Sequence, residues 1–202
     1  MTIFLNQFDL MNFILDTEYL TWSNRSNLND KFRKKWQKKE IIQIGVCQVI
    51  EKKNKLFIRK KLNIFVKPKF NPIIPKRIIE LTKITQKTID KKGIPYKEAL
   101  KKLNKFIGNS AKIVSNGDEK KLFIYNYKIN KLNIASKIEK AKFIDLKKLL
   151  IKEYGKKKYF TADLSKIFNF KQEKKPHNAL YDCFTIAKCI NNSLKKNNCT
   201  IF

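Results

Sequence analysis

The sequence is poor in acidic residues. It has 17 Asp and Glu residues against 46 Lys and Arg residues, which gives a formal net charge of +29 over 202 positions. A surface of this charge attracts polyanions, of which nucleic acid is the commonest. Only four of the basic residues are arginine. Because abundant Lys, Asn and Ile are also typical of an AT-rich coding sequence, codon usage is a second source of the charge.

Other absences narrow the class of protein. The four cysteines form no Cys-x-x-Cys pair and no Cys/His cluster with metal-site spacing. We therefore expect reduced, mostly buried thiols in a cytoplasmic protein. The apolar start lacks a basic region and a small-residue cleavage site, which argues against a secretory signal. No apolar run approaches the ~18 residues of a membrane span, so no membrane partner is expected.

Apolar segments with turn signals between them predict a mixed β-sheet. Segments 11–15, 41–50 and 55–68 indicate three strands, and the short link "EKKNK" between the last two predicts an antiparallel hairpin. Segments 112–115 and 141–146 indicate two further strands, separated by helical periods. The expected class is therefore α/β, with a five-stranded mixed sheet, three antiparallel-type strands first, and helices on both faces.

The same pattern predicts a single domain. With 202 residues, the chain is long enough for one sizeable core. We expect the domain to cover residues 1–202, with its core at about 11–195 and a basic excursion at 21–40. A last helix is expected after Pro176.

Two of the scarce acids, Asp16 and Glu18, follow the first apolar strand in "FILDTEYL". Residues two apart on a strand point to the same side, so these carboxylates can converge. At about 4 Å they repel by roughly 1 kcal/mol in water and about 4 kcal/mol at an effective dielectric constant of 20. A divalent cation with hard oxygen ligands, Mg²⁺ or Mn²⁺, removes this conflict. Taken alone, the pair is better explained by an acid that ends a strand or caps a turn.

Further along the chain, three residues strengthen the metal interpretation. Asp118 ends a short apolar segment, and Asp182 lies in the last predicted helix, five residues after His177, the only histidine. Read singly, Asp118 fits a helix N-cap and His177 fits a loop residue without a role. Together with the D-x-E pair, they provide four carboxylates and one imidazole, a combination that chance rarely assembles.

This arrangement resembles the DEDDh 3′-to-5′ exonucleases, which have a ribonuclease H-like fold. Ala179 stands where the sister DEDDy group has tyrosine, and His177 fits the DEDDh subgroup. The "GDEKKL" segment is more similar to Eri-type and related bacterial sequences than to proofreading enzymes. The loop between Thr21 and Glu40 has no residue-by-residue match in the family. The matching segments follow the family's order: "FILDTEYL", "EIIQIGVCQV", "ELTKITQKTI", "VSNGDEKKL" and "HNALYDC".

The resemblance implies phosphodiester hydrolysis with two divalent cations, Mg²⁺ or Mn²⁺. Asp16 would bridge both ions, while Glu18 and Asp182 would hold the ion on the nucleophile's side. Asp118 would complete the set through waters of the second ion. His177 would accept the proton of the attacking water, and 5′-nucleoside monophosphates would leave the 3′ end.

The resemblance also suggests substrate contacts at Thr17, Tyr19, Leu20 and Trp22, where family members wedge and stack terminal bases. Tyr19 and Leu20 fit the protein core equally well. The expected partner is a single-stranded nucleic acid or a 3′ overhang, with RNA favoured over DNA. Two alternatives stay open, a nucleic-acid-binding module without catalysis and a hydrolase of dinucleotides or short oligonucleotides on the same scaffold.

Overall fold

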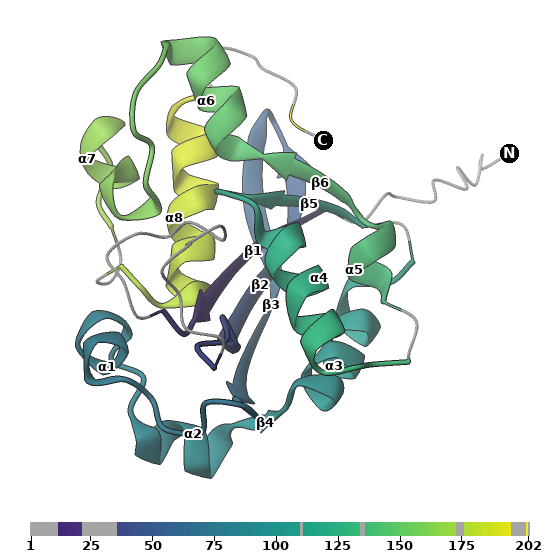
Figure 1. Ribbon diagram of the computed structural model, residues 1–202. Coiled ribbons are helices and arrows are strands. Elements are labelled where there is room, and N and C mark those ends of the chain that lie inside the picture. The colour runs from purple at the N-terminus through teal and green to yellow at the C-terminus, as the bar shows by residue number, and fades with distance from the viewer. Residues whose placement is uncertain are drawn as a thin grey trace, which may run out of the picture.

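The computed structural model describes residues 12–21, 36–109, 111–133, 136–172, 176–194 and 201. Within these ranges, six strands form one sheet in the order β4-β3-β2-β1-β5-β6, with helices on both faces (Figure 1). The α/β class and the mixed, doubly covered sheet are therefore confirmed. The predicted number of five strands is wrong.

The centre of the sheet is an antiparallel set of long strands: β1 (Asn12–Tyr19), β2 (Ile41–Lys52) and β3 (Lys55–Lys67). Strand β1 continues beyond the apolar segment 11–15. Its later residues pair with β2, with Asp16 opposite Gly45 and Glu18 opposite Gln43. The two acids are thus held in extended backbone by the neighbouring strand.

Shorter strands complete the edges of the sheet: β4 (Ile94–Pro95), β5 (Lys112–Ser115) and β6 (Lys142–Asp145). Strand β5 runs parallel to β1, and β6 runs parallel to β5. The strand that the sequence failed to indicate is β4, which pairs only with Val66 and Lys67 of β3. It has two residues, one of them proline, and so short a strand leaves no periodic pattern.

Helices connect and flank these strands. Among the described residues, no helix combines the length and the apolar character that crossing a membrane requires. The last helix begins at Ala179, close to its predicted start, and the side chain of Asn178 caps it by accepting the N–H of Tyr181. In chain order the helices are α1 (Lys76–Thr82), α2 (Gln86–Lys92), α3 (Tyr96–Ile107), α4 (Glu119–Ile129), α5 (Lys137–Lys140), α6 (Leu146–Tyr154), the 3₁₀ turn η1 (Thr161–Asp163), α7 (Leu164–Ile167) and α8 (Ala179–Asn192).

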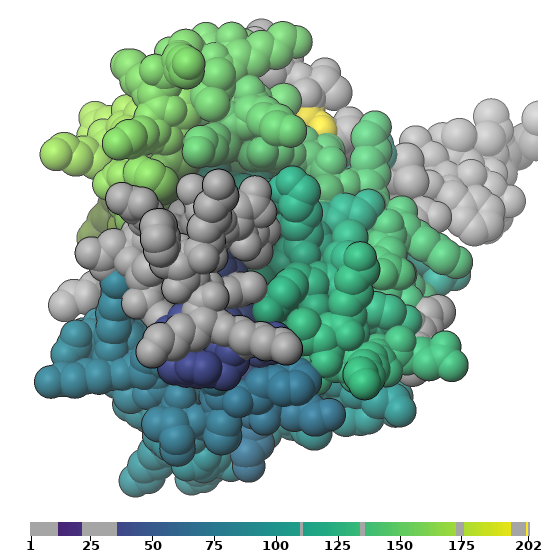
Figure 2. Space-filling view, viewed as in Figure 1, coloured from purple at the N-terminus to yellow at the C-terminus, as the bar shows by residue number. Residues whose placement is uncertain are grey.

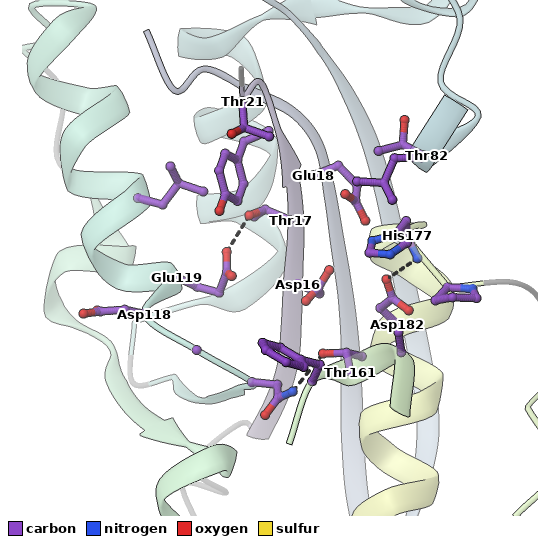
Figure 3. A pocket seen from close by; sticks show the side chains of 18 of the residues that line it. Asp16, Thr17, Glu18, Thr21, Thr82, Asp118, Glu119, Thr161, His177 and Asp182 are labelled. Atoms are coloured by element: carbon purple, nitrogen blue, oxygen red, sulfur yellow. Dashed lines mark hydrogen bonds between the residues drawn. The ribbon is translucent and has the colours of Figure 1, made fainter. Parts of the chain in front are cut away.

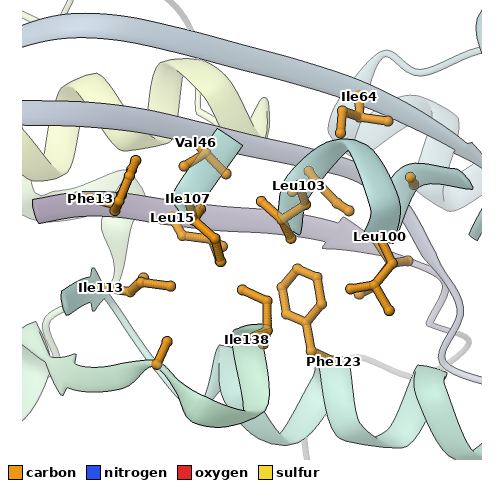
Figure 4. Close-up of a cluster of buried hydrophobic side chains, with 14 of the residues drawn as sticks. Phe13, Leu15, Val46, Ile64, Leu100, Leu103, Ile107, Ile113, Phe123 and Ile138 are labelled. Atoms are coloured by element: carbon orange, nitrogen blue, oxygen red, sulfur yellow. The ribbon is translucent and has the colours of Figure 1, made fainter. Parts of the chain in front are cut away.

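Alternation along β1 distributes its side chains between two cores. Phe13 packs in a cluster with α3, α4 and α5 (Figure 4). Ile14 packs on the opposite face, in a cluster with α6, α7 and α8. By the same alternation, Asp16 and Glu18 point to the face that α8 covers, whereas Thr17 points to the face of α4.

A third, smaller cluster attaches α1 and α2 to the end of the sheet where β1 stops. It is made of Leu20, Ile42, Ile74, Ile78, Ile84 and Ile89. On the face seen in Figure 2, α1 and α2 (blue) form the lower part, α4 (teal) lies at the right and α6 (green) forms the upper part. These elements surround the end of β1 that carries the acids.

Candidate active site

The carboxylates of Asp16, Glu18 and Asp182 come together at the end of β1. Each offers an oxygen atom that lies within 4.8 Å of those of the other two. Glu18 and Asp182 are buried, with 8% and 4% of their surface exposed. Two acids from a strand and one from a helix 164 residues later in the chain thus share one small volume, as Figure 3 shows.

Helix α8 approaches the sheet closely because of two residues of β2. A Cβ atom at Gly45 would lie 2.3 Å from the carbonyl carbon of Ala179, so only glycine admits the start of the helix here. The buried side chain of Gln43 accepts the N–H of Ala179 at 3.1 Å. The sequence signal for this docking is the polar Gln43 and the glycine within the apolar run "IIQIG". Both residues fix the position of Asp182.

His177 lies beside these acids in a loop that ends at α8. Its φ angle is 67°, a left-handed conformation that is uncommon for residues other than glycine. Its backbone N–H donates to Oδ2 of Asp182 at 3.0 Å. The imidazole lines the same cavity as the acids (Figure 3), and burial lowers the pKa of His177. The neutral, proton-accepting form therefore persists below the ordinary pKa of 6.5.

Asp118, the acid that the sequence suggested as a fourth ligand, lies at the rim. It precedes the first residue of α4, its side chain is half exposed, and Lys121 forms an ion pair with it. The neighbouring Glu119 faces the cluster instead and accepts a hydrogen bond of 2.5 Å from Oγ1 of Thr17. Figure 3 shows Asp16 between Glu119 and Asp182, with Asp118 farther out. Which of the two adjacent acids points inward depends on the residue at which α4 begins. The sequence does not predict that residue to within one position.

Burial raises the pKa of all four inward carboxylates, and neighbouring carboxylates raise the pKa of three of them further, with Asp118 acting on Glu119. Burial raises the pKa of Asp16 and of Glu18 well above the ordinary value, and nearby carboxylates raise both further. Among the carboxylates, the largest contribution comes from Glu119 for Asp16 and from Asp182 for Glu18. Burial also raises the pKa of Glu119 to about 7 and that of Asp182 to about 6. Without a counter-charge, the cluster therefore retains protons near neutral pH.

This donor set fits a divalent cation. Oδ1 of Asp182 is buried and has no hydrogen-bond partner among the described residues. A buried, unpaired acceptor is costly unless a cation or a donor occupies the space before it. Carboxylate oxygens are the hard ligands that Mg²⁺ and Mn²⁺ prefer. Asp16, Glu18 and Asp182 would therefore hold such an ion.

The acids lie in a cavity of about 620 Å³, a volume suited to a nucleotide-sized ligand. Arg77 and Leu81 of α1 line one part of it, and Lys147, Phe160 and Thr161 line another. The wall of the cavity thus carries cationic and apolar side chains, while its floor is acidic. Such a wall suits the phosphates and bases of a nucleic acid.

The predicted substrate contacts have different outcomes. Thr17 and Tyr19 line the cavity. The prediction for Leu20 is wrong, because its side chain is fully buried in the cluster with Ile42 and cannot reach a ligand. Trp22 lies outside the described residues.

The chain matches a family of known proteins. A search of curated proteins finds no match. A model of the RNase T family, described as "Exonuclease", matches residues 13–190. This range contains every acid of the cluster and His177, and it covers most of the 202-residue chain.

Several solved structures share the fold. The nuclease domain of 3′hExo, a DEDDh family member bound to rAMP, has a TM-score of 0.78 at 19% identity, over 97% of this chain and 96% of that one. A 3′-exonuclease that recognises the histone mRNA stem-loop also has a TM-score of 0.78, at 18% identity, over 95% of this chain. E. coli Exonuclease I with a dA16 oligonucleotide has a TM-score of 0.67 at 11% identity, over 92% of this chain.

The last two proteins are longer, and the chain spans 65% and 41% of their lengths. At these identities, the likeness establishes the fold. The family match and the fold agree with the acidic cluster and the histidine beside it. The chain belongs to the RNase T exonuclease family, as the resemblance to exonucleases predicted, and it shares its fold with a DEDDh family member.

Proposed function

We propose that the protein removes 5′-nucleoside monophosphates one at a time from single-stranded 3′ ends, with RNA favoured over DNA. The observation that carries this proposal is the convergence of Asp16, Glu18 and Asp182 within 4.8 Å, in a cavity that His177 also lines. Family membership supplies the class of reaction. The substrate and the roles of the residues below are the proposal.

The acids would hold two divalent cations, Mg²⁺ or Mn²⁺. When bound, such ions stabilise both the attacking and the leaving oxygen of a phosphodiester displacement. Asp16, which lies between Glu119 and Asp182, would contact both ions, and Glu18 and Asp182 would hold one of them. Glu119, which we assign in place of Asp118, lies on the other side, where Thr17 orients its carboxylate.

His177 would act as the general base. Its pKa is lowered by burial, so the imidazole is neutral at the pH of the cell and can take a proton from a water molecule. The hydrogen bond from its backbone to Asp182 keeps the ring near the acids. The proton would leave to solvent through the open side of the cavity after the monophosphate departs.

Charge and family likeness support a nucleic-acid substrate. The net charge of +29 favours a polyanion, and the cavity wall includes Arg77 and Lys147. The similar structures were determined with an mRNA stem-loop, with rAMP and with single-stranded DNA. The two with RNA ligands have the higher TM-score, 0.78 against 0.67, which supports our preference for RNA.

A substrate panel tests the proposal. Purified protein is incubated with single-stranded RNA, single-stranded DNA, a duplex with a 3′ overhang, and dinucleotides, each with Mg²⁺ or Mn²⁺. We expect release of 5′-monophosphates from the 3′ ends, no release in EDTA, and faster turnover of the longer RNA strand than of dinucleotides. Faster turnover of dinucleotides would instead identify a short-oligonucleotide hydrolase.

Asp16→Asn keeps the shape of the side chain and removes its charge, so it should abolish activity while the protein stays folded. The matched control is Asp90→Asn on α2, an exposed acid outside the cavity, which should retain full activity. Hydrolysis that survives in EDTA or in Asp16→Asn would refute the mechanism. Tight, salt-sensitive binding without turnover under any divalent ion would identify a binding module instead.

A further inference from the structure

Phe160 is an exposed aromatic residue in the wall of the catalytic cavity. Just over half of its surface, 53%, is accessible, although it lies between residues that are well anchored. An exposed phenyl ring gains nothing for the free protein, because apolar surface in water is unfavourable. Its location in the same cavity as Asp16 and His177 suggests that a ligand covers it.

One side chain binds the residues on both sides of Phe160. Nδ2 of Asn116 donates to the carbonyl of Tyr159 at 3.0 Å and to Oγ1 of Thr161 at 2.9 Å. Asn116 follows β5, only a few residues before Glu119, so it ties the wall to the end of the sheet that carries the acids. The position of Phe160 is thereby coupled to the catalytic floor.

Tyr159 anchors the same segment from behind. It is 1% exposed, its ring stacks on that of Phe168 with centroids 6.2 Å apart, and its hydroxyl donates to the carbonyl of Gly155. Buried Tyr159 and exposed Phe160 are adjacent, and the turn η1 begins directly after them. The segment therefore holds the ring of Phe160 outward on a rigid support, which lowers the entropic cost of stacking on it.

A cation accompanies this ring. Nζ of Lys147, which also lines the cavity, lies 5.9 Å from the ring centroid of Phe160. Among the residues that the structure describes, no carboxylate forms an ion pair with Lys147. A flat apolar face next to an unneutralised ammonium group matches a nucleotide, whose base stacks and whose phosphate carries the charge.

We propose that Phe160 and Lys147 form a nucleotide subsite. The ring of Phe160 stacks on an unpaired base within the last few nucleotides of the substrate strand, and Lys147 contacts an adjacent phosphate. This proposal rests on the proposed function, because it assumes a nucleic-acid strand in the cavity. It is separate from the contacts suggested near Tyr19, which belong to β1. It also explains a preference for single strands, since the faces of bases inside a duplex are already stacked on the neighbouring base pairs.

The test measures each protein variant on a complete strand and on strands that lack one base. Wild type and Phe160→Ala are assayed on a single strand with all its bases, and on strands that lack the base at one of the last four positions. On the complete strand, Phe160→Ala should lower kcat/KM by about 5- to 150-fold, the range that aromatic–base stacking supports. On the strand that lacks the stacked base, wild type and variant should differ by less than about 2-fold.

Matched variants separate stacking from other effects. Phe160→Trp should keep the rate, while Phe160→Leu, apolar but not aromatic, should lose most of it. Phe57→Ala removes an equally exposed ring, 49% accessible, from β3 outside the cavity and should leave the rate unchanged. Lys147→Gln should reduce the slope of log binding constant against log salt concentration by about 0.7, the value for one phosphate contact on a single strand. Lys148→Gln, at an exposed residue outside the cavity, should leave this slope unchanged.

The outcomes distinguish the two proposals. If wild type hydrolyses no strand, the proposed function fails. If wild type is active but the loss in Phe160→Ala is equal on every abasic strand, or absent altogether, the subsite proposal fails. A full rate in Phe160→Leu would also overturn the assignment of stacking, because leucine offers no π-face.

Discussion

The two ends of the β2–β3 hairpin differ sharply in character. At the catalytic end, Gln43 and Gly45 are buried and contact α8 through a hydrogen bond and a close backbone approach. At the turn end, residues 52–61 include six Lys or Arg residues and no acid, and Leu56 is their only buried side chain. One end holds a carboxylate cluster in place, whereas the other is a solvated, cationic arm.

This difference shows where the fold constrains sequence. At the turn end, the exposed positions accept most polar residues. Leu56 is the only buried side chain among residues 52–61, and α8 contacts it through the apolar cluster and through hydrogen bonds from Asn191 to its backbone. At the catalytic end, one added carbon atom at Gly45 would displace the helix that carries Asp182. Substitutions at the catalytic end should therefore lower activity or stability more than substitutions at the turn end.

After the loss of activity expected for Asp16→Asn, the largest effect is expected for His177→Ala. Loss of a general base should lower kcat by ~10²–10⁴ with little change in KM. Because burial lowers the pKa of His177, the acidic limb of the wild-type pH profile should lie below pH 6.5 and should vanish in the variant. Lys60→Gln at the turn end is the control and should leave kcat unchanged. An unaltered acidic limb in His177→Ala would assign the proton transfer to another group.

The next effect separates two adjacent acids. Glu119→Gln removes a carboxylate that faces Asp16 and should lower kcat by about 10- to 100-fold, the range found when groups around a metal site are changed. Asp118→Asn removes only a half-exposed acid paired with Lys121 and should change kcat by less than about 2-fold. Steady-state rates with saturating Mn²⁺ provide the measurement. The reverse order of effects would restore Asp118 as the functional acid.

A smaller effect concerns stability. Gly45→Ala should lower the free energy of unfolding by about 1–3 kcal/mol, because its Cβ would overlap the backbone of Ala179. Lys60→Ala, exposed near the turn end of the hairpin, should stay within ~0.5 kcal/mol of wild type. Urea denaturation followed by circular dichroism measures both. Equal stability of the two variants would mean that α8 can move away from the sheet at little cost.

The smallest effect is a dependence of stability on pH. The folded state raises the pKa of Glu119 to about 7, so it binds this proton more tightly than the unfolded chain does. Without metal, a rise in pH across this range therefore destabilises wild type relative to Glu119→Gln, which cannot titrate there. Between pH 5 and pH 8, the Tm of Glu119→Gln should rise relative to that of wild type. Mn²⁺ should stabilise wild type more at pH 8 than at pH 5, and a pH-independent difference would contradict the account.

Sequence alone predicts much of the fold and most of the catalytic floor. Asp16 and Glu18 stand out because two charges interrupt an apolar strand. His177 stands out because it is the only histidine, and Asp182 because it is an acid among apolar residues of the last helix. The sequence indicated Asp118 where we propose Glu119, because a helix boundary uncertain by one residue reverses which side chain points inward.

The wall of the cavity was less predictable. Leu20 looks like a ligand contact by its place after the acids, yet it packs under α1, a segment more than fifty residues away. Phe160 comes after three lysines and Tyr159, and in the sequence it resembles any exposed loop residue. The hydrogen bonds from Asn116 and the packing of Tyr159 reveal that it is held in the cavity. Such contacts leave no periodic pattern in a sequence.

The central claim is that Asp16, Glu18, Asp182 and Glu119 hold divalent ions while Asp118 does not. Diffraction at the manganese absorption edge from a crystal grown with Mn²⁺ and a nucleoside 5′-monophosphate tests it most directly. We predict anomalous peaks within ligand distance of Asp16, one shared with Glu18 and Asp182 and one on the side of Glu119. No peak at Asp16, or a peak that Asp118 ligates in place of Glu119, would contradict the account.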